Sequence, residues 1–99
     1  MPRKKKEEII KEAEEKAKDI LADIDFLLGD RTIPRNIKKA LTEVKTKVEK
    51  EYSNQKEITE AIYIVDDISN DINLPLHAKT DLWNLLSKLE SLKETIKKL

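Results

Sequence analysis

The chain contains one internal repeat, and this repeat constrains the fold more than any other feature. The segment 69–83, SNDINLPLHAKTDLW, matches the segment 28–42, LGDRTIPRNIKKALT, at an interval of 41 residues. The matching positions are Asp30 and Asp71, Ile33 and Leu74, Pro34 and Pro75, Lys38 and Lys79, and Leu41 and Leu82. In both segments a helical pattern ends, a turn follows, and a new helix starts with a proline in its first turn, where the missing N–H costs little. The repeat therefore predicts two copies of one helical hairpin.

Apolar residues recur at intervals of three and four along the chain, which predicts four amphipathic helices. We expect them over about Arg3–Leu28, Thr32–Tyr52, Gln55–Ser69 and from Leu74 to near the end. Because short connections make consecutive helices alternate in direction, the predicted fold class is all-α, an antiparallel up-and-down four-helix bundle. It forms one helical domain over 1–99, with hairpins at about 3–52 and 55–98. A closed bundle and an open stack of two hairpins both satisfy this pattern.

The expected helix ends also agree between the two halves. Gly29, the only glycine, follows the first predicted helix, and Asn70 holds the equivalent position in the second hairpin. Glycine and asparagine are the residues that most readily adopt the left-handed conformation found after many helices, so we expect a left-handed cap at both positions. Asn54, with Glu57 three residues later, resembles a capping box at the start of the third helix.

The fourth predicted helix has the spacing of a coiled-coil seam. Its large aliphatic residues are Leu82, Leu85, Leu89, Leu92, Ile96 and Leu99. The small Ala13 and Ala17 of the first helix would accommodate the later leucines, because bulky faces need small ones opposite. Any part of the seam left exposed would be a place for a second subunit, so we hypothesise a homo-oligomer formed through this helix.

Charge is sorted by helix, although the whole chain has 20 basic and 20 acidic residues. The segment 31–52 has seven basic and three acidic residues, whereas 53–73 has one and five. One interpretation is complementary packing between neighbouring helices. The other is that Arg31, Arg35, Lys38, Lys39 and Lys45 present a basic face to an anionic partner. We favour the first interpretation.

The residue types needed for common active sites are missing or poorly spaced. The chain has no cysteine, which excludes disulfides, thiolate nucleophiles and cysteine-ligated zinc. His77 is the only histidine and belongs to no HExxH or Glu-x-x-His spacing, so we expect a neutral, hydrogen-bonded ring with a structural role. Asp66, Asp67 and Asp71 could bind magnesium, but capping of the next helix explains aspartates at this place better. We predict no catalytic residue, no metal, no cofactor and no enzyme activity.

The remaining candidates point to binding surfaces. No apolar run approaches the roughly 20 residues of a membrane span, so we expect no membrane partner and a cytoplasmic location. We expect Trp83, the only tryptophan, to be buried between the hairpins; if exposed, it would anchor a partner. The candidate interaction surface comprises Arg31, Arg35, Lys38, Lys39, Lys45, His77 and Trp83.

Two stretches, TIPRNIKKA and ISNDINLPLHAKTDLWNLLSKLE, resemble the archaeal UPF0147 family of small helical proteins. The resemblance covers about Ile20 to Glu90, and its most specific part is SND-x-N-x-PLHA-(Lys or Arg)-T-x-x-WN. It implies a compact four-helix bundle from an archaeal cytoplasm. It supplies no catalytic residues, because no activity is assigned to the family.

Two functional hypotheses follow. The first is a non-enzymatic helical protein-interaction module that self-associates. The alternative is a small nucleic-acid-associated protein that uses the basic face of the second helix, with the basic start Arg3-Lys4-Lys5-Lys6 beside it. A magnesium-dependent hydrolase would require the aspartates to converge in a pocket, and we place it third.

Overall fold

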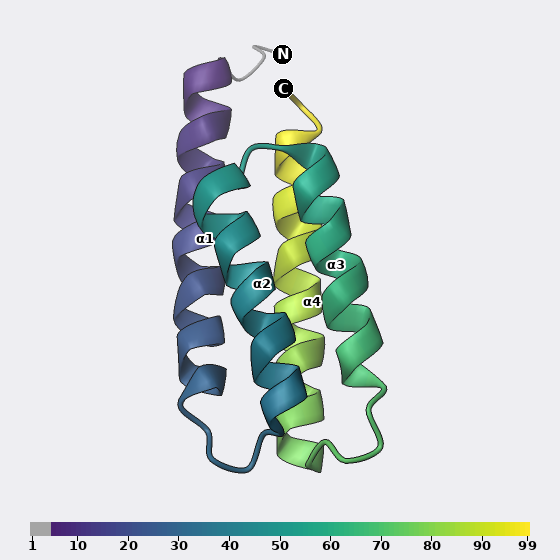
Figure 1. The fold of residues 1–99 in the computed structure, drawn as a ribbon. Coiled ribbons are helices and arrows are strands. Elements are labelled where there is room, and N and C mark those ends of the chain that lie inside the picture. The colour runs from purple at the N-terminus through teal and green to yellow at the C-terminus, as the bar shows by residue number, and fades with distance from the viewer. Residues whose placement is uncertain (1–4) are drawn as a thin grey trace.

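A computed structural model describes residues 5–99 and contains four helices, shown in Figure 1. They are α1 (Lys6–Leu28), α2 (Arg35–Glu51), α3 (Gln55–Ser69) and α4 (Leu76–Ile96). The helices alternate in direction, so the two ends of the chain lie at one end of the bundle and the α1–α2 and α3–α4 loops lie at the other. We call the second end, with the helical turns next to it, the loop end. The predicted all-α, antiparallel four-helix fold is confirmed, while Arg3 and Lys4 of the basic start lie outside the described residues.

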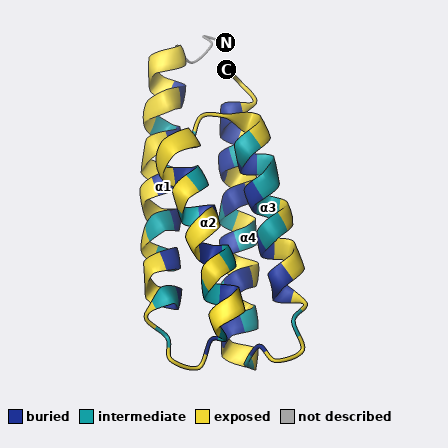
Figure 2. Ribbon diagram, viewed as in Figure 1, coloured by how far each residue is buried: buried dark blue, intermediate teal, exposed yellow. Residues whose placement is uncertain are grey.

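The bundle is closed. Each helix packs against two neighbours, and α1 packs against α4 as well as α2, which completes the ring. Figure 2 shows that the buried faces of the helices point inward and the exposed faces outward. The leucine seam of α4 lies inside this ring: Leu82, Leu85, Leu89 and Leu92 are all 0% exposed. Of the predicted seam Leu99, which follows α4, is exposed at 41%, so most of the seam is used within the core and little of it is open to a second subunit.

The small residues of α1 are buried and lie beside α4, as expected from the sequence. Ala13 and Ala17 are buried, and the Nζ of Lys16 between them lies 2.9 Å from Ser91 Oγ and 2.7 Å from Thr95 Oγ1 of α4. These contacts set the small face of α1 beside the last turns of α4. Close approach of the two helices therefore depends on alanine at these positions.

The repeat is visible in the loops as well as in the core. Asp30 Oδ1 accepts a hydrogen bond from the backbone N–H of Thr32, and Asp71 Oδ1 accepts one from the N–H of Asn73, both at 2.8 Å. After each of these turns comes a proline, Pro34 or Pro75, whose carbonyl accepts the first hydrogen bonds of the next helix. The aspartates thus stabilise the loops and do not cap α2 or α4, whose N-cap residues are the prolines.

The expectation of left-handed caps was wrong. Gly29 has φ −83° and ψ −7°, and Asn70 has φ −93° and ψ 2°, so both remain on the right-handed side. No residue of the described chain 5–99 has a positive φ. The aspartate turns supply the physical reason, because a side-chain acceptor one residue later reverses the chain without a left-handed residue.

Gly29 is therefore replaceable. We expect Gly29→Ala to raise the free energy of unfolding by about 0.4–1 kcal/mol, because alanine fits this backbone and restricts the unfolded chain. A Cβ built at this position would lie no closer than 3.6 Å to another heavy atom, which is ordinary van der Waals contact. Urea unfolding of both proteins measures the difference. A loss of stability would show that the backbone at Gly29 is left-handed after all.

Of the capping box predicted at the start of α3, one half is present. Asn54 Oδ1 accepts hydrogen bonds from the backbone N–H groups of Lys56 (3.1 Å) and Glu57 (3.3 Å), which confirms Asn54 as the cap of α3. The carboxylate of Glu57 does not return to the cap. It binds Lys47 of α2 at 2.8 Å and so ties the two hairpins together.

Candidate interaction surfaces

The two loops are linked by a reciprocal pair of contacts. His77 Nε2 on α4 lies 2.9 Å from Asp30 Oδ2 in the first loop. Asn36 Nδ2 on α2 donates to Asp71 Oδ2 in the second loop at 3.3 Å. Asn36 and His77 are 41 residues apart, as are Asp30 and Asp71. Each hairpin therefore contributes one loop aspartate and one helix residue, at equivalent positions of the repeat, to the contacts with the other hairpin. We call these four residues the loop clasp; it gives His77 the structural hydrogen bond that the sequence predicted.

The clasp perturbs the ionisation of Asp30. The pKa of its carboxyl is lowered from 3.8 to about 2, first by the hydroxyl of Thr32, then by the backbone N–H of Thr32, and then by His77. Thr32 Oγ1 donates to Asp30 Oδ1 at 2.6 Å. These donors favour the charged carboxylate, so the clasp is built for an ionised Asp30.

The lowered pKa predicts a specific acid sensitivity. Since the folded pKa lies below the unfolded one, Asp30 contributes stability above pH 3.8, and this contribution is lost as the pH falls through 3.8 to about 2. We expect Asp30→Asn to flatten the curve of unfolding free energy against pH within this window. Asp67→Asn removes an exposed carboxylate without a side-chain hydrogen bond in the described chain and serves as the control. Equal pH curves for wild type and Asp30→Asn would refute the assignment.

Several lysines form ion pairs between helices. Lys45 Nζ lies 2.8 Å from Asp25 of α1, and this hydrogen bond raises the pKa of the lysine. Lys47 binds Glu57 at 2.8 Å and Glu60 at 2.9 Å, both on α3. These ion pairs are the complementary packing of neighbouring helices that was expected from the sequence. Lys45, one of the predicted surface residues, is thus engaged inside the chain.

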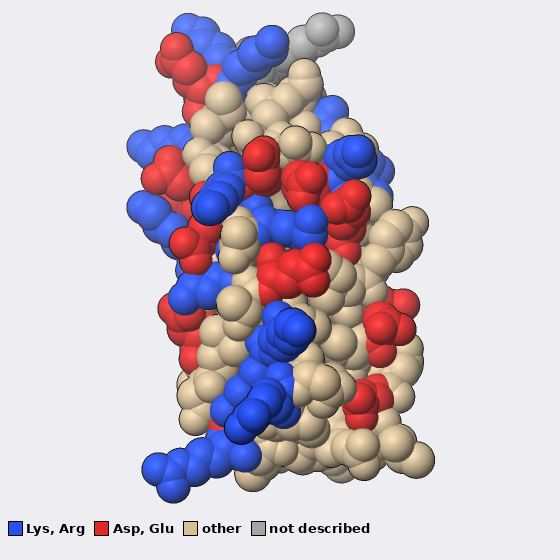
Figure 3. Space-filling model, viewed as in Figure 1, with Lys and Arg blue, Asp and Glu red and all other residues tan. Residues whose placement is uncertain are grey.

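The other four basic residues of the predicted surface are not neutralised. Arg31, Arg35, Lys38 and Lys39 form no ion pair within residues 5–99. Figure 3 shows Lys and Arg side chains running along the lower part of α2 toward the loop end. We call these four residues the basic strip. Of the five basic residues that the sequence singled out, these four lie in the α1–α2 loop and the first turns of α2 without an ion pair in the described chain, whereas Lys45 lies further along α2 and is paired.

Trp83 lies on the surface, and the expectation that it is buried between the hairpins was wrong. Its side chain is 55% exposed, because Leu82 and Leu85 take the inward positions of this part of α4 and leave position 83 outside. Leu76 is 75% exposed and precedes Trp83 by two helical turns, so the two side chains share one outward face.

Two further exposed apolar residues lie toward the loop end. Phe26 near the end of α1 is 73% exposed, and Ile72 in the α3–α4 loop is 91% exposed. We call Phe26, Ile72, Leu76 and Trp83 the apolar loop-end set. The sequence analysis missed Phe26, Ile72 and Leu76 as surface residues. A usable signal existed, because Phe26 and Leu76 lie outside the three-four spacing of their helices and Ile72 lies in the segment between two helical patterns.

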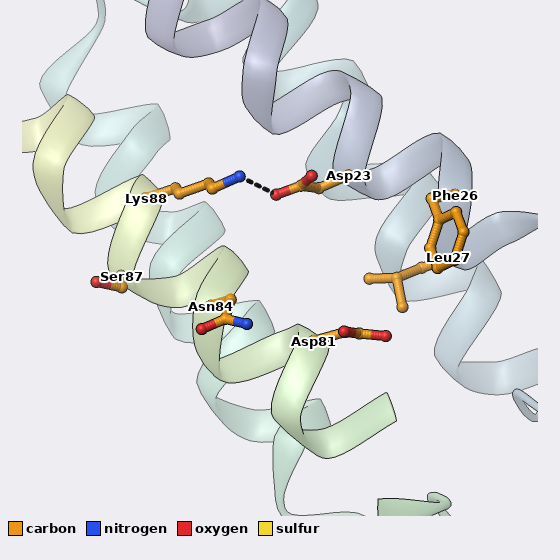
Figure 4. Close-up of a pocket in the computed structure, with 7 residues that line it drawn as sticks. All are labelled: Asp23, Phe26, Leu27, Asp81, Asn84, Ser87 and Lys88. Atoms are coloured by element: carbon orange, nitrogen blue, oxygen red, sulfur yellow. Dashed lines mark hydrogen bonds and ion pairs between the residues drawn. The ribbon is translucent and has the colours of Figure 1, made fainter. Parts of the chain in front are cut away.

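A groove separates α1 from α4 beside Phe26. Its volume is about 340 Å³, and it is lined by Asp23, Phe26, Leu27, Asp81, Asn84, Ser87 and Lys88. Figure 4 shows the α1 residues facing the α4 residues, with Lys88 closing one side through a hydrogen bond to Asp23. Asn84 follows Trp83 directly, so the groove and the outward face of α4 adjoin. The lining combines the aromatic ring of Phe26 with carboxylate, amide, hydroxyl and ammonium groups.

Within residues 5–99 no group of three or more histidine, aspartate or glutamate side chains is arranged to hold a metal ion. None of the helices in this part of the chain combines the length and the hydropathy that a membrane span requires.

The fold and surfaces define a class, a closed all-α bundle with an apolar loop end. The model of the Uncharacterised protein family (UPF0147) matches residues 4–92, and the chain belongs to this family. The match includes all of α1, which extends the resemblance found in the sequence.

Relatives from archaea have the same family name. The UPF0147 protein MJ1419 of Methanocaldococcus jannaschii is 41% identical over 86 residues, which cover 84% of this chain and 90% of the relative. The UPF0147 protein of Archaeoglobus fulgidus is 39% identical over 72 residues, 73% of this chain and 83% of the relative. A crystal structure titled "unknown function protein MMP1188" is similar with a TM-score of 0.70 and 35% identity, covering 77% of this chain and 88% of that one.

Proposed function

We propose that this protein is a non-enzymatic protein-interaction module that binds its partner through the apolar loop-end set. The observation that carries the proposal is the exposure of four large apolar side chains, from 55% for Trp83 to 91% for Ile72, toward one end of the bundle. Exposed apolar groups concentrated in one region are typical of interaction sites, and tryptophan is enriched among the anchor residues of interfaces. The adjoining groove gives a partner side chain a place to enter. A cytoplasmic location remains part of this proposal.

The test compares partner capture by matched variants. A tagged wild-type protein, a Leu76→Ala/Trp83→Ala variant and an Ile10→Ala control are incubated with native extract, with and without nuclease. Ile10 is 39% exposed near the opposite end of the bundle, so the control should behave as wild type. We expect the double variant to bind the recovered partner at least about 30-fold more weakly, the loss typical of an anchor residue. Equal capture by the double variant would overturn the proposal.

The nucleic-acid alternative is supported by the basic strip. The four basic residues that form no ion pair within residues 5–99 can neutralise phosphates, and such binding falls steeply with salt. The measurement is the fluorescence anisotropy of labelled single-stranded RNA and duplex DNA at low salt, with Arg35→Glu/Lys39→Glu as the variant. Binding that is lost in the variant and in high salt would establish this alternative. No change in anisotropy at low salt would remove it.

A further inference from the structure

We propose that the face formed by α2 and α3 is a self-association surface on which two copies of the chain pair as a parallel two-fold dimer. The proposal concerns a different surface from the apolar loop-end set and does not depend on it. Charge on the lower part of this face is sorted by helix. Arg35 and Lys39 lie in the first turns of α2, whereas Asp66 and Asp67 lie in the last turn of α3. Figure 3 shows basic side chains over the lower part of α2 and acidic side chains to their right, toward α3.

These four side chains are exposed, and none forms an ion pair within the described residues. They differ in this from the upper part of the same face, where Lys47 pairs with Glu57 and Glu60. Ion pairs within one copy are therefore confined to the upper half of the α2–α3 face. The lower half presents a basic patch on α2 and an acidic patch on α3.

Both patches oppose the dipole of their own helix. The first turn of α2 contains no acidic residue, and the last turn of α3 contains no basic residue. Positive charge at a helix N-terminus and negative charge at a C-terminus each destabilise the isolated helix. An oppositely charged surface placed over each patch relieves both conflicts at once.

A second copy provides that surface. A two-fold rotation about an axis parallel to the helices sets α2 of one copy over α3 of the other and keeps the loop ends level. The basic patch then meets the acidic patch twice, as in an isologous interface. A rotation about the perpendicular axis would move the basic patch to the opposite end of the bundle, away from the aspartates. The charge pattern thus selects the parallel arrangement.

The centre of the face has a large apolar group to bury. Tyr63 on α3 is 69% exposed and stands one turn before Asp66 and Asp67. The ion pairs of Lys47 with Glu57 and Glu60 place Tyr63 level with the region of Thr42, a small exposed residue of α2. In the parallel dimer Tyr63 of each copy faces this smaller part of the other copy. Acidic residues next to the basic patch would repel phosphates, so the face suits a second copy better than nucleic acid.

Charge reversal tests the proposal. We expect the wild type to sediment as a dimer at low salt and to dissociate as salt is raised. Arg35→Glu/Lys39→Glu and Asp66→Lys/Asp67→Lys should each weaken association by about tenfold or more, because like charges then face each other. An equimolar mixture of the two variants should recover the dimer, since every contact across the heterodimer is again between opposite charges. The control Lys11→Glu/Lys18→Glu makes the same charge change on α1 and should remain dimeric.

Thermal unfolding separates a lost interface from a damaged fold. Each reversed variant agrees with its helix dipoles, so under dilute conditions where the wild type is also monomeric it should unfold at an equal or higher temperature than wild type. A wild type that is monomeric at low salt and high concentration would overturn the proposal. So would a dimer that persists in Arg35→Glu/Lys39→Glu, or two monomeric variants that fail to associate on mixing. A monomeric wild type that binds labelled RNA through Arg35 and Lys39 would assign the basic strip to nucleic acid instead.

Discussion

Replacing Leu82 by alanine lowers the free energy of unfolding by about 2–5 kcal/mol, because the truncation leaves a cavity in a fully buried site. Leu82 is 0% exposed, and so is Leu41, its counterpart in the first hairpin. If the two hairpins are equivalent, Leu41→Ala should cost a similar amount. Either change would shift the midpoint of thermal unfolding by roughly 4–8 °C for each kcal/mol in a chain of this size.

The matched control is Leu76→Ala, which truncates the same residue type on the outside of α4. Leu76 is 75% exposed, so we expect a change within about 0.5 kcal/mol. Chemical denaturation of the three variants under one buffer condition gives the comparison. A large loss for Leu82→Ala together with a neutral Leu41→Ala would show that the halves do not contribute equally to the core.

Enlarging Ala13 to leucine lowers the free energy of unfolding by about 1–3 kcal/mol, because a well-packed core cannot accept the added methyl groups without displacing its neighbours. Ala13 is 0% exposed and belongs to the small face that brings α1 close to α4. Ala22→Leu introduces the same change on the exposed side of α1 and should cost little. An unchanged stability for Ala13→Leu would mean that α1 and α4 are not closely packed there.

The sequence predicted the architecture well because its strongest signals are local. The three-four spacing of aliphatic residues identifies inward faces, and the two proline turns identify the reversals between helices. The caps at Gly29 and Asn70 were mispredicted because residue type shows only which conformations are allowed. The backbone at these positions depends on the turns made by Asp30 and Asp71, whose hydrogen bonds appear only in the structure.

The candidate surfaces were predicted less completely. The basic strip was found, since charge composition is readable from the chain, but ion pairing was not, so Lys45 was grouped with it although Asp25 engages it. Trp83 was placed inside because it lies near the junction of the repeat, whereas its position one residue past Leu82 sets it outside. The three-four spacing of apolar residues along α4 was the better guide to the exposure of Trp83. The groove beside Phe26 depends on the pairing of α1 with α4, which sequence alone left open.

The central claim is that the loop end presents apolar side chains to a partner, and Trp83 reports on it directly as the only tryptophan. The measurement is acrylamide quenching of tryptophan fluorescence in the free protein, with the urea-unfolded chain as reference. Because Trp83 is 55% exposed, we expect an emission close to that of the unfolded chain and ready quenching, and then protection when the recovered partner is added. A blue-shifted emission that resists quenching in the free protein would contradict the account.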